Sequence, residues 1–223
     1  MKFNKHPSIQ LVELFKKKPY QGQSPHQAKV IFLSSDANYS EEISNHSFFK
    51  LILEYHEDGI TFWKKYGIHH PFLHATYPFK KNQGGVPFHK RFTSIGLTSD
   101  YAEYVCFLEL LDIPTIGSMS KDKKLFLNLI NISHLKQIDE LIQSNDGKLF
   151  LVSKNVIQMM HLLKKKYGVF KWLKPEVDSV GDQILINSNE VKVIYHFSAS
   201  VTSEYRKNLK KYIDQVICYF LQK

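Results

Sequence analysis

Short apolar runs rich in β-branched and aromatic residues alternate with longer amphipathic segments along this chain. The clearest runs are KVIFL at 29–33, YVCFLELL at 104–111, KLFLV at 148–152 and VKVIYH at 191–196, with a shorter one at 184–186. The segments between them include stretches with the apolar spacing of helices, and a last such stretch follows at the C-terminal end. Strands that alternate with helices build a parallel sheet covered on both faces, so the pattern predicts an α/β protein.

Size and composition fit one domain with a single core. The chain has 223 residues, of which 43% are hydrophobic and 23% charged, as in folded globular proteins. No apolar run approaches about 18 residues, so no membrane span is predicted, and the first residues lack the apolar core of a signal peptide. The two cysteines, Cys106 and Cys218, lie among apolar neighbours, which predicts buried free thiols. We therefore expect a single domain over residues 1–223, located in the cytoplasm.

The charge balance predicts an anionic partner. Thirty lysines and arginines against 21 acidic residues give a net charge of +9, and there are 11 histidines in addition. Such a basic balance is typical of proteins that bind nucleic acids. The alternative is a basic surface that is only solvated. No feature of the sequence indicates a membrane or an obligatory protein partner.

Polar residues follow the predicted strands at their carboxyl ends. In parallel sheets these ends share one edge, and binding sites lie just outside it. Asp36 follows the first strand, Glu109 interrupts the apolar end of the second, and His196 ends the last. Each has a structural alternative: a turn or capping acid, a buried acid paired with a cation, and a hydrogen-bonded strand end. The topology predicts that the three converge at one edge.

Residues 67–91 form a long stretch without a helix or strand pattern, and a helix is expected to begin within 92–97. Long loops inside compact domains are usually functional, and this one is aromatic and basic. We interpret its histidines as solvated or phosphate-contacting side chains, with a metal site as the alternative. These histidines are His69, His70, His74 and His89. The chain lacks the P-loop, the dinucleotide-binding glycine motif and HExxH, so neither a metal nor a cofactor is expected.

Four segments, in order along the chain, resemble motifs of the uracil-DNA glycosylase superfamily. The segment SDANY at 35–39 follows the first strand, where the family carries G-Q-D-P-Y or G-I-N-P-G. GGVPFHKRF at 84–92 stands in place of a loop that leads into an aromatic-containing helix. CFLE at 106–109 corresponds to a strand that ends in L-L-L-N, and HFSAS at 196–200 corresponds to H-P-S before the last helix.

The resemblance covers roughly residues 8–220. It implies a three-layer α/β sandwich with a central, mostly parallel, four-stranded sheet flanked by helices. It also implies a monofunctional DNA glycosylase, which flips a damaged or deaminated base and hydrolyses its N-glycosidic bond in DNA repair. No lysine occupies a matched motif position, so no Schiff-base intermediate is expected. Carried over onto this chain, the catalytic residues are Asp36 and His196, the base-binding residues are Asn38, Tyr39, Phe92 and Glu109, and the DNA-binding residues are Lys90, Arg91, Ser198 and Ser200.

Departures from the family motifs keep other functions open. Ala37 and Phe197 replace the motif prolines, one residue is inserted before Tyr39, and Glu109 replaces the strand-end asparagine. The alternatives are a nucleic-acid-binding protein of the same fold without catalysis, or a hydrolase of free nucleosides or nucleotides. An ionised Glu109 can only accept hydrogen bonds, which predicts weak or no uracil release at neutral pH. A protonated Glu109 would restore a donor and permit that release.

Overall fold

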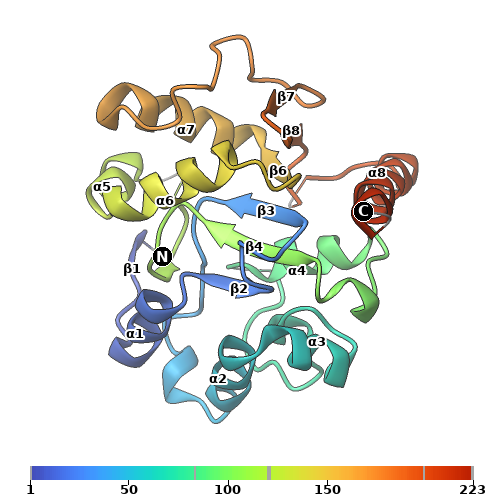
Figure 1. Cartoon of the computed structure of the whole chain (residues 1–223). Helices are drawn as coiled ribbons and strands as arrows, with labels where there is room; N and C mark the ends of the chain where they lie inside the picture. The colour runs from blue at the N-terminus through green and yellow to red at the C-terminus, as the bar shows by residue number, and fades with distance from the viewer. Residues whose placement is uncertain (1, 83, 120–121, 198, 222–223) are drawn as a thin grey trace.

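A six-stranded sheet runs through the centre of the molecule (Figure 1). The computed structural model describes residues 2–82, 84–119, 122–197 and 199–221. The strand order in this sheet is β2-β4-β3-β6-β8-β7, and β1 pairs with β5 in a separate two-stranded sheet. The strands are β1 (Asn4–Lys5), β2 (Tyr20–Gly22), β3 (Val30–Ser34), β4 (Val105–Glu109), β5 (Thr115–Ile116), β6 (Leu149–Ser153), β7 (Gln183–Ile186) and β8 (Asn189–Ile194).

The four central strands, β4, β3, β6 and β8, are parallel, and the edge strands β2 and β7 are antiparallel to their neighbours. The α/β class is therefore confirmed, whereas the expected four-stranded sheet is wrong, because the sheet is six-stranded and mixed. β2 was missed because three residues in a polar context carry no alternation of apolar and polar side chains. β7 extends the sheet as the partner of β8 in a hairpin.

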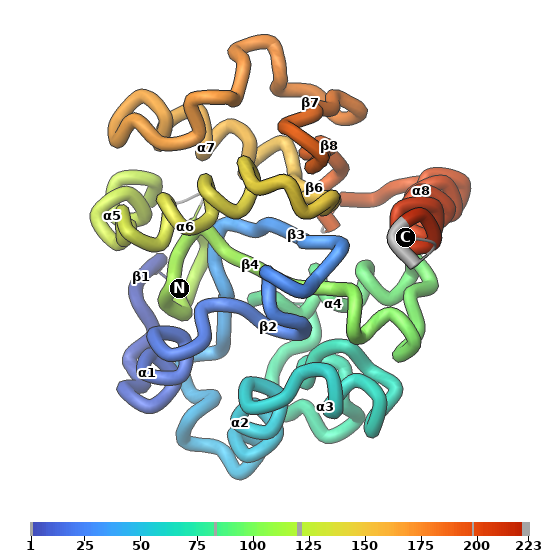
Figure 2. The backbone as a smooth tube through the Cα atoms, viewed as in Figure 1, coloured from blue at the N-terminus to red at the C-terminus, as the bar shows by residue number. Residues whose placement is uncertain are grey.

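Helices pack against both faces of the sheet (Figures 1 and 2). The helices α5, α6 and α7 cover one face, while α4, α8 and Trp63 of α3 cover the other. α1 and α2 pack together with the 3₁₀ turn Pro71–Leu73. The helices are α1 (Ile9–Lys17), α2 (Phe49–Glu57), α3 (Gly59–Tyr66), α4 (Val86–Thr93), α5 (Lys123–Asn128), α6 (Ile132–Gln143), α7 (Lys154–Tyr167) and α8 (Ser203–Leu221).

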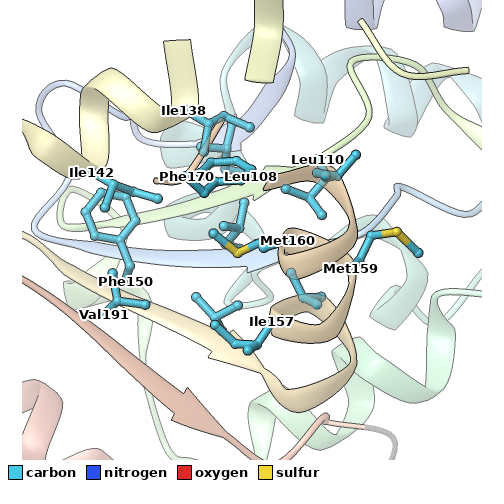
Figure 3. Packing of buried hydrophobic residues seen from close by; sticks show 14 of the residues in the cluster. Leu108, Leu110, Ile138, Ile142, Phe150, Ile157, Met159, Met160, Phe170 and Val191 are labelled. Carbon is cyan, nitrogen blue, oxygen red and sulfur yellow. The ribbon is translucent and has the colours of Figure 1, made fainter. Parts of the chain in front are cut away.

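The two faces of the sheet follow the two-residue period of its strands. In β3, Ile31 and Leu33 pack toward α5–α7, whereas Val30 and Phe32 pack toward α4 and α8. Figure 3 shows part of the first cluster, where the α7 side chains lie against the sheet. Because the apolar residues of β3, β4 and β6 are buried on both faces, the polar residues that end these strands are the first positions at which this part of the sheet can meet a ligand.

Two local expectations are wrong. α4 begins at Val86 rather than after residue 91, because Pro87 lies in its first turn, where the missing N–H of proline costs no hydrogen bond. Both cysteines are free, but only Cys106 is buried; Cys218 is exposed, since Ile217 and Ile213 form the sheet-facing side of α8. Among the described residues, no helix is long and apolar enough to cross a membrane.

Candidate active site at the carboxyl ends of the parallel strands

One row of residues crosses the carboxyl ends of the central strands. Glu109 of β4 lies opposite Ser34 of β3, and Ser153 of β6 lies opposite Ile194 of β8. By strand alternation, Glu109, Ser34 and Ser153 share the face that α4 and α8 cover. From β3 the chain continues to β4 on one side and later to β6 on the other, so the strand order reverses between β3 and β6. Ligands of open α/β sheets bind at such a point.

Asp36 lies just beyond the end of β3, with its carboxylate held by two hydroxyl groups. Oγ of Ser35 donates to Oδ1 at 2.7 Å, and Oγ1 of Thr115 donates to Oδ2. Burial of the carboxyl raises its pKa above the ordinary value, while hydrogen bonds from Thr115, Ser35 and Asn38 oppose that rise. The residue as a whole is half-buried, and the two hydroxyl donors fix the direction of its carboxylate.

The backbone after Asp36 is fixed by β5. The N–H of Thr115 donates to the carbonyl of Ala37, and the N–H of Tyr39 donates to the carbonyl of Thr115, both at 2.9 Å. Nδ2 of Asn38 donates to Oγ1 of Thr115 at 3.3 Å and to the carbonyl of Gly117. The amide group of Asn38 is therefore engaged in holding this loop. Thr115 is fully buried and binds the carboxylate of Asp36, so it acts as a positioning residue.

Close backbone packing brings the start of α4 against the same loop. The N–H of Gly85 donates to the carbonyl of Asn38 at 3.3 Å. A Cβ atom at Gly85 would lie 2.9 Å from Cε2 of Phe72 and 3.2 Å from that carbonyl, so the position requires glycine. This contact places Phe88, one turn into α4, beside the strand ends.

His196 reaches the same edge from the end of β8. Burial lowers the pKa of its imidazole, the negative charge of Asp36 raises it, and the positive charge of Arg91 lowers it. The reciprocal effect of His196 on the pKa of Asp36 shows that the two side chains interact electrostatically. The ring lies 5.8 Å from the ring of Phe88. With its pKa lowered, His196 is neutral at neutral pH and can donate or accept one hydrogen bond at each nitrogen.

Glu109 is buried and only 6% exposed, and its Oε2 has no hydrogen-bond partner among the described residues. Burial, together with the charge of Asp36, raises the pKa of Glu109 to about 8. Of two neighbouring carboxyls the one in the more polar surroundings ionises first, so Asp36 carries the charge and Glu109 keeps its proton at neutral pH. The alternative of a salt-bridged Glu109 is wrong, since no described cation pairs with it.

A shallow, open hollow lies at the ends of β3, β6 and β8. Its lining includes Ser34, Ser153, His196 and the half-buried rings of Phe88 and Phe197. Oγ of Ser153 is buried without a partner among the described residues. Ser153 is the N-cap residue of α7, but its side chain makes no capping hydrogen bond. The first N–H groups of a helix favour an anion. The hollow thus combines the aromatic rings of Phe88 and Phe197 with hydrogen-bond donor groups on Ser34, Ser153 and His196.

The other predicted site residues differ in how far they are buried. Tyr39 is 2% exposed and its hydroxyl accepts from Nε2 of Gln21 at 2.9 Å, while Phe92 is fully buried against Phe32 and Phe107. Neither offers a free ring face at the surface, whereas the half-buried ring of Phe88 lines the hollow. Lys90, Arg91 and Ser200 are exposed, and Ser198 lies outside the described residues.

The loop histidines are not solvated, which corrects the expectation for three of them. His69, His70 and His89 are buried; Nε2 of His69 lies 3.0 Å from Nδ1 of His89, and the rings of His70 and His89 stack at 3.7 Å. His74 is half-buried. Within the described part of the chain no group of three or more His, Cys, Asp or Glu residues is arranged to hold a metal ion.

Sequence reasoning missed Thr115, Ser153 and Arg206 as parts of this region. The first two follow predicted strands, so the carboxyl-end rule points to their segments, but a hydroxyl group carries no motif of its own. Arg206 gave no signal because it lies in a helix far along the chain. Comparison with protein-family models, curated proteins and solved structures gives no match for this chain.

Proposed function

We propose that this protein is a DNA glycosylase-like enzyme that hydrolyses the N-glycosidic bond of a base flipped out of DNA. The observation that carries the proposal is a hollow at the switch point of the sheet, lined by His196, Phe88 and Phe197, with the hydrogen-bonded carboxylate of Asp36 just beyond the end of β3. The resemblance of the segments at 35–39 and 196–200 to the glycosylase motifs supports the same assignment.

Asp36 supplies the negative charge that this reaction needs. As the glycosidic bond breaks, positive charge develops on the sugar, and water attacks the anomeric carbon. A carboxylate that Ser35 and Thr115 hold in place can orient that water and stabilise the sugar cation. Because its hydrogen-bond donors are already in place, little reorganisation is needed at the moment of reaction.

His196 acts on the departing base. The base leaves with negative charge on a carbonyl oxygen, and a neutral imidazole N–H stabilises it by hydrogen bonding. The lowered pKa keeps His196 in that neutral form at neutral pH. The rings of Phe88 and Phe197 give the flipped base a stacking surface.

Glu109, which ends β4 opposite Ser34, is assigned to reading the edge of the base. In its neutral form the carboxyl both donates and accepts, so it can pair with a C=O next to an N–H, as in uracil or hypoxanthine. The repulsion expected between an ionised Glu109 and O4 of uracil is then absent. A neutral carboxyl also fits the amino edge of cytosine, so Glu109 alone does not choose between them. We expect uracil release at neutral pH that weakens as the pH rises through about 8.

The test is base release from a panel of duplexes, each with one deaminated or damaged base, followed by alkaline cleavage of abasic sites. Under single-turnover conditions, Asp36→Asn and His196→Ala should each slow release by about 10²–10³-fold, because each removes one preorganised electrostatic group. Asp139→Asn is the matched control. Asp139 is also half-buried and accepts hydrogen bonds, from Phe170 and Trp172, but it lies in α6.

Rates in Asp36→Asn and His196→Ala equal to that of Asp139→Asn would contradict the assigned roles. Failure to release any base of the panel, with duplex binding intact, would favour a binding protein without catalysis. Release from nucleosides or nucleotides but not from duplexes would favour the free-substrate hydrolase.

A further inference from the structure

Both arginines of this chain line one hollow beside His196. Of the 30 lysines and arginines only Arg91 and Arg206 are arginine, and they lie on separate helices, α4 and α8. The hollow lies between the end of α4, the connection from β8 and the first turns of α8. His196 and Phe197 line both this hollow and the one at the strand ends, so the two adjoin.

Arg206 is fixed in position by its neighbours. Its Nη1 donates to Oγ of Ser94 at 3.2 Å, and its Nη2 donates to the carbonyl of Val201 at 2.9 Å. Oγ of Ser94 donates in turn to the carbonyl of Arg91 at 2.5 Å, which links α4 to α8. A guanidinium has five N–H donors, so this arrangement orients the group and leaves donors for a ligand.

No acidic side chain balances the charge in this hollow. Among its described lining residues there is no carboxylate, and neither arginine forms an ion pair with another residue that the structure describes. Arg91 lies near enough to His196 for its charge to lower the pKa of the imidazole. Two guanidinium groups that face one hollow without a counter-ion suit an oxyanion.

We propose that Arg91 and Arg206 form a phosphate-binding site that receives the phosphate next to the sugar held at Asp36 and His196. A guanidinium presents a planar fork that matches two phosphate oxygens, whereas an ammonium is a point charge. This chain uses lysine for all its other cationic residues, so arginine at both positions of one hollow indicates a requirement for geometry. The phosphate belongs either to a DNA strand or to a free nucleotide. Its assignment to the cleaved nucleotide rests on the proposed function, whereas the phosphate site itself does not.

The test compares three double variants by equilibrium binding. The first is Arg91→Lys with Arg206→Lys, which keeps both charges, and the second is Arg91→Ala with Arg206→Ala. The control is Lys123→Ala with Lys124→Ala, which removes two charges from α5 on the opposite side of the sheet. The probes are a short duplex with a stable abasic-site analogue, a deoxynucleoside 5′-monophosphate and the matching deoxynucleoside. Thermal melting confirms that each variant is folded.

We expect the lysine pair to weaken duplex binding by about tenfold or more without changing its salt dependence, because charge is kept and the paired hydrogen bonds are lost. The alanine pair should also lower the slope of log K against log salt by about 2. The control should change duplex affinity less than about twofold. Equal affinities of wild type and both arginine variants for the duplex and for the nucleoside monophosphate, or an equal loss in the control, would overturn the phosphate site.

The probes separate the two sources of phosphate. Loss of duplex binding in the arginine variants assigns the site to a DNA strand. A loss confined to the nucleoside monophosphate, with nucleoside binding unchanged, assigns it to a free nucleotide. If the arginine variants lose binding while no duplex in the lesion panel releases a base, the phosphate site holds and the glycosylase proposal fails. If the arginine variants bind every probe as wild type does while Asp36→Asn abolishes base release, the glycosylase proposal holds and the phosphate site fails.

Discussion

The two ends of the same parallel strands treat buried polar groups in opposite ways. At the amino end, Nζ of Lys148 donates to the carbonyls of His26 and Ala28 at 2.6 and 3.0 Å. Beside it, Asn189 accepts from the N–H of Lys148 at 2.6 Å, and its amide donates to carbonyls at the end of α6. At the carboxyl end, Oε2 of Glu109 and Oγ of Ser153 have no partner among the described residues.

This difference distinguishes buried polar groups that stabilise the fold from buried polar groups that are available to a ligand. A buried polar group that lacks a partner costs about 1–3 kcal/mol, so native proteins satisfy nearly all of them. Lys148 and Asn189 are satisfied by the fold itself and tie loops to the sheet. Glu109 and Ser153 are held in place without that compensation, which is expected where a ligand completes the hydrogen bonding. Glu190, near the amino end of β8, also has one unpartnered oxygen, Oε1, but its Oε2 accepts from the hydroxyl of Tyr212. The ring nitrogens of His56 are unpartnered too, and this ring packs against Phe15.

Acidification should have the largest effect, because it should lower the stability of the region around His69, His70 and His89 before that of the amino end of the strands. Burial lowers the pKa of His89 to about 3 and those of His69 and His70 well below the ordinary value. The unfolded chain takes up protons near pH 6.5, so the stabilisation is complete above that pH and is lost as the pH falls toward 3. All three histidines act in the same direction, so the free energy of unfolding should fall progressively as the pH drops below about 6.5.

Hydrogen exchange across this pH range measures the effect. Protection should fall in α4, which carries His89, before it falls in β6 and around Asn189. Simultaneous loss at both ends would contradict the prediction. His89→Gln, which cannot take up a proton in this range, should lessen the acid sensitivity.

Substitutions of buried polar residues at the two ends should change the free energy of unfolding by different amounts. Asn189→Ala leaves the N–H of Lys148 and carbonyls of α6 unsatisfied, so it should lower the free energy of unfolding by about 3 kcal/mol. That corresponds to about 6–12 °C in the melting temperature for a chain of this length. Glu109→Gln replaces a neutral carboxyl by a neutral amide and should not destabilise the protein at pH 7. An equal loss in both variants would remove the distinction between the ends.

Much of this arrangement could be predicted from the sequence because it depends on local pattern and chain order. The apolar runs at 29–33, 104–111 and 148–152 predict parallel strands, and the residues that follow them must then share one edge. The convergence of Asp36 and His196 is a consequence of that topology. The extra strand β2 could not be predicted, since a three-residue edge strand is set by its partner β4 and not by its own pattern.

Side-chain burial was the part that the sequence left open. Tyr39 and Phe92 have the same composition signal as Phe88, yet only Phe88 reaches the hollow, because the packing of α1, α4 and the sheet decides which rings are covered. The sequence around His69, His70 and His89 predicts solvated loop residues. They are buried in the structure, because α4 begins at Val86 and packs His89 against the other two. Arg206 meets Ser94 only through tertiary contact between α8 and α4.

The central claim is that two neighbouring carboxyls are held in different protonation states, with Asp36 ionised and Glu109 protonated at neutral pH. Carboxyl-selective ¹³C labelling of glutamate and an NMR pH titration test it directly, and Glu109→Gln identifies the signal. A raised pKa means that Glu109 should titrate near pH 8 and that wild type should lose stability relative to Glu109→Gln as the pH rises from about 4.5 to 8. A Glu109 signal that titrates near pH 4.5, with parallel stability curves for the two proteins, would contradict the account.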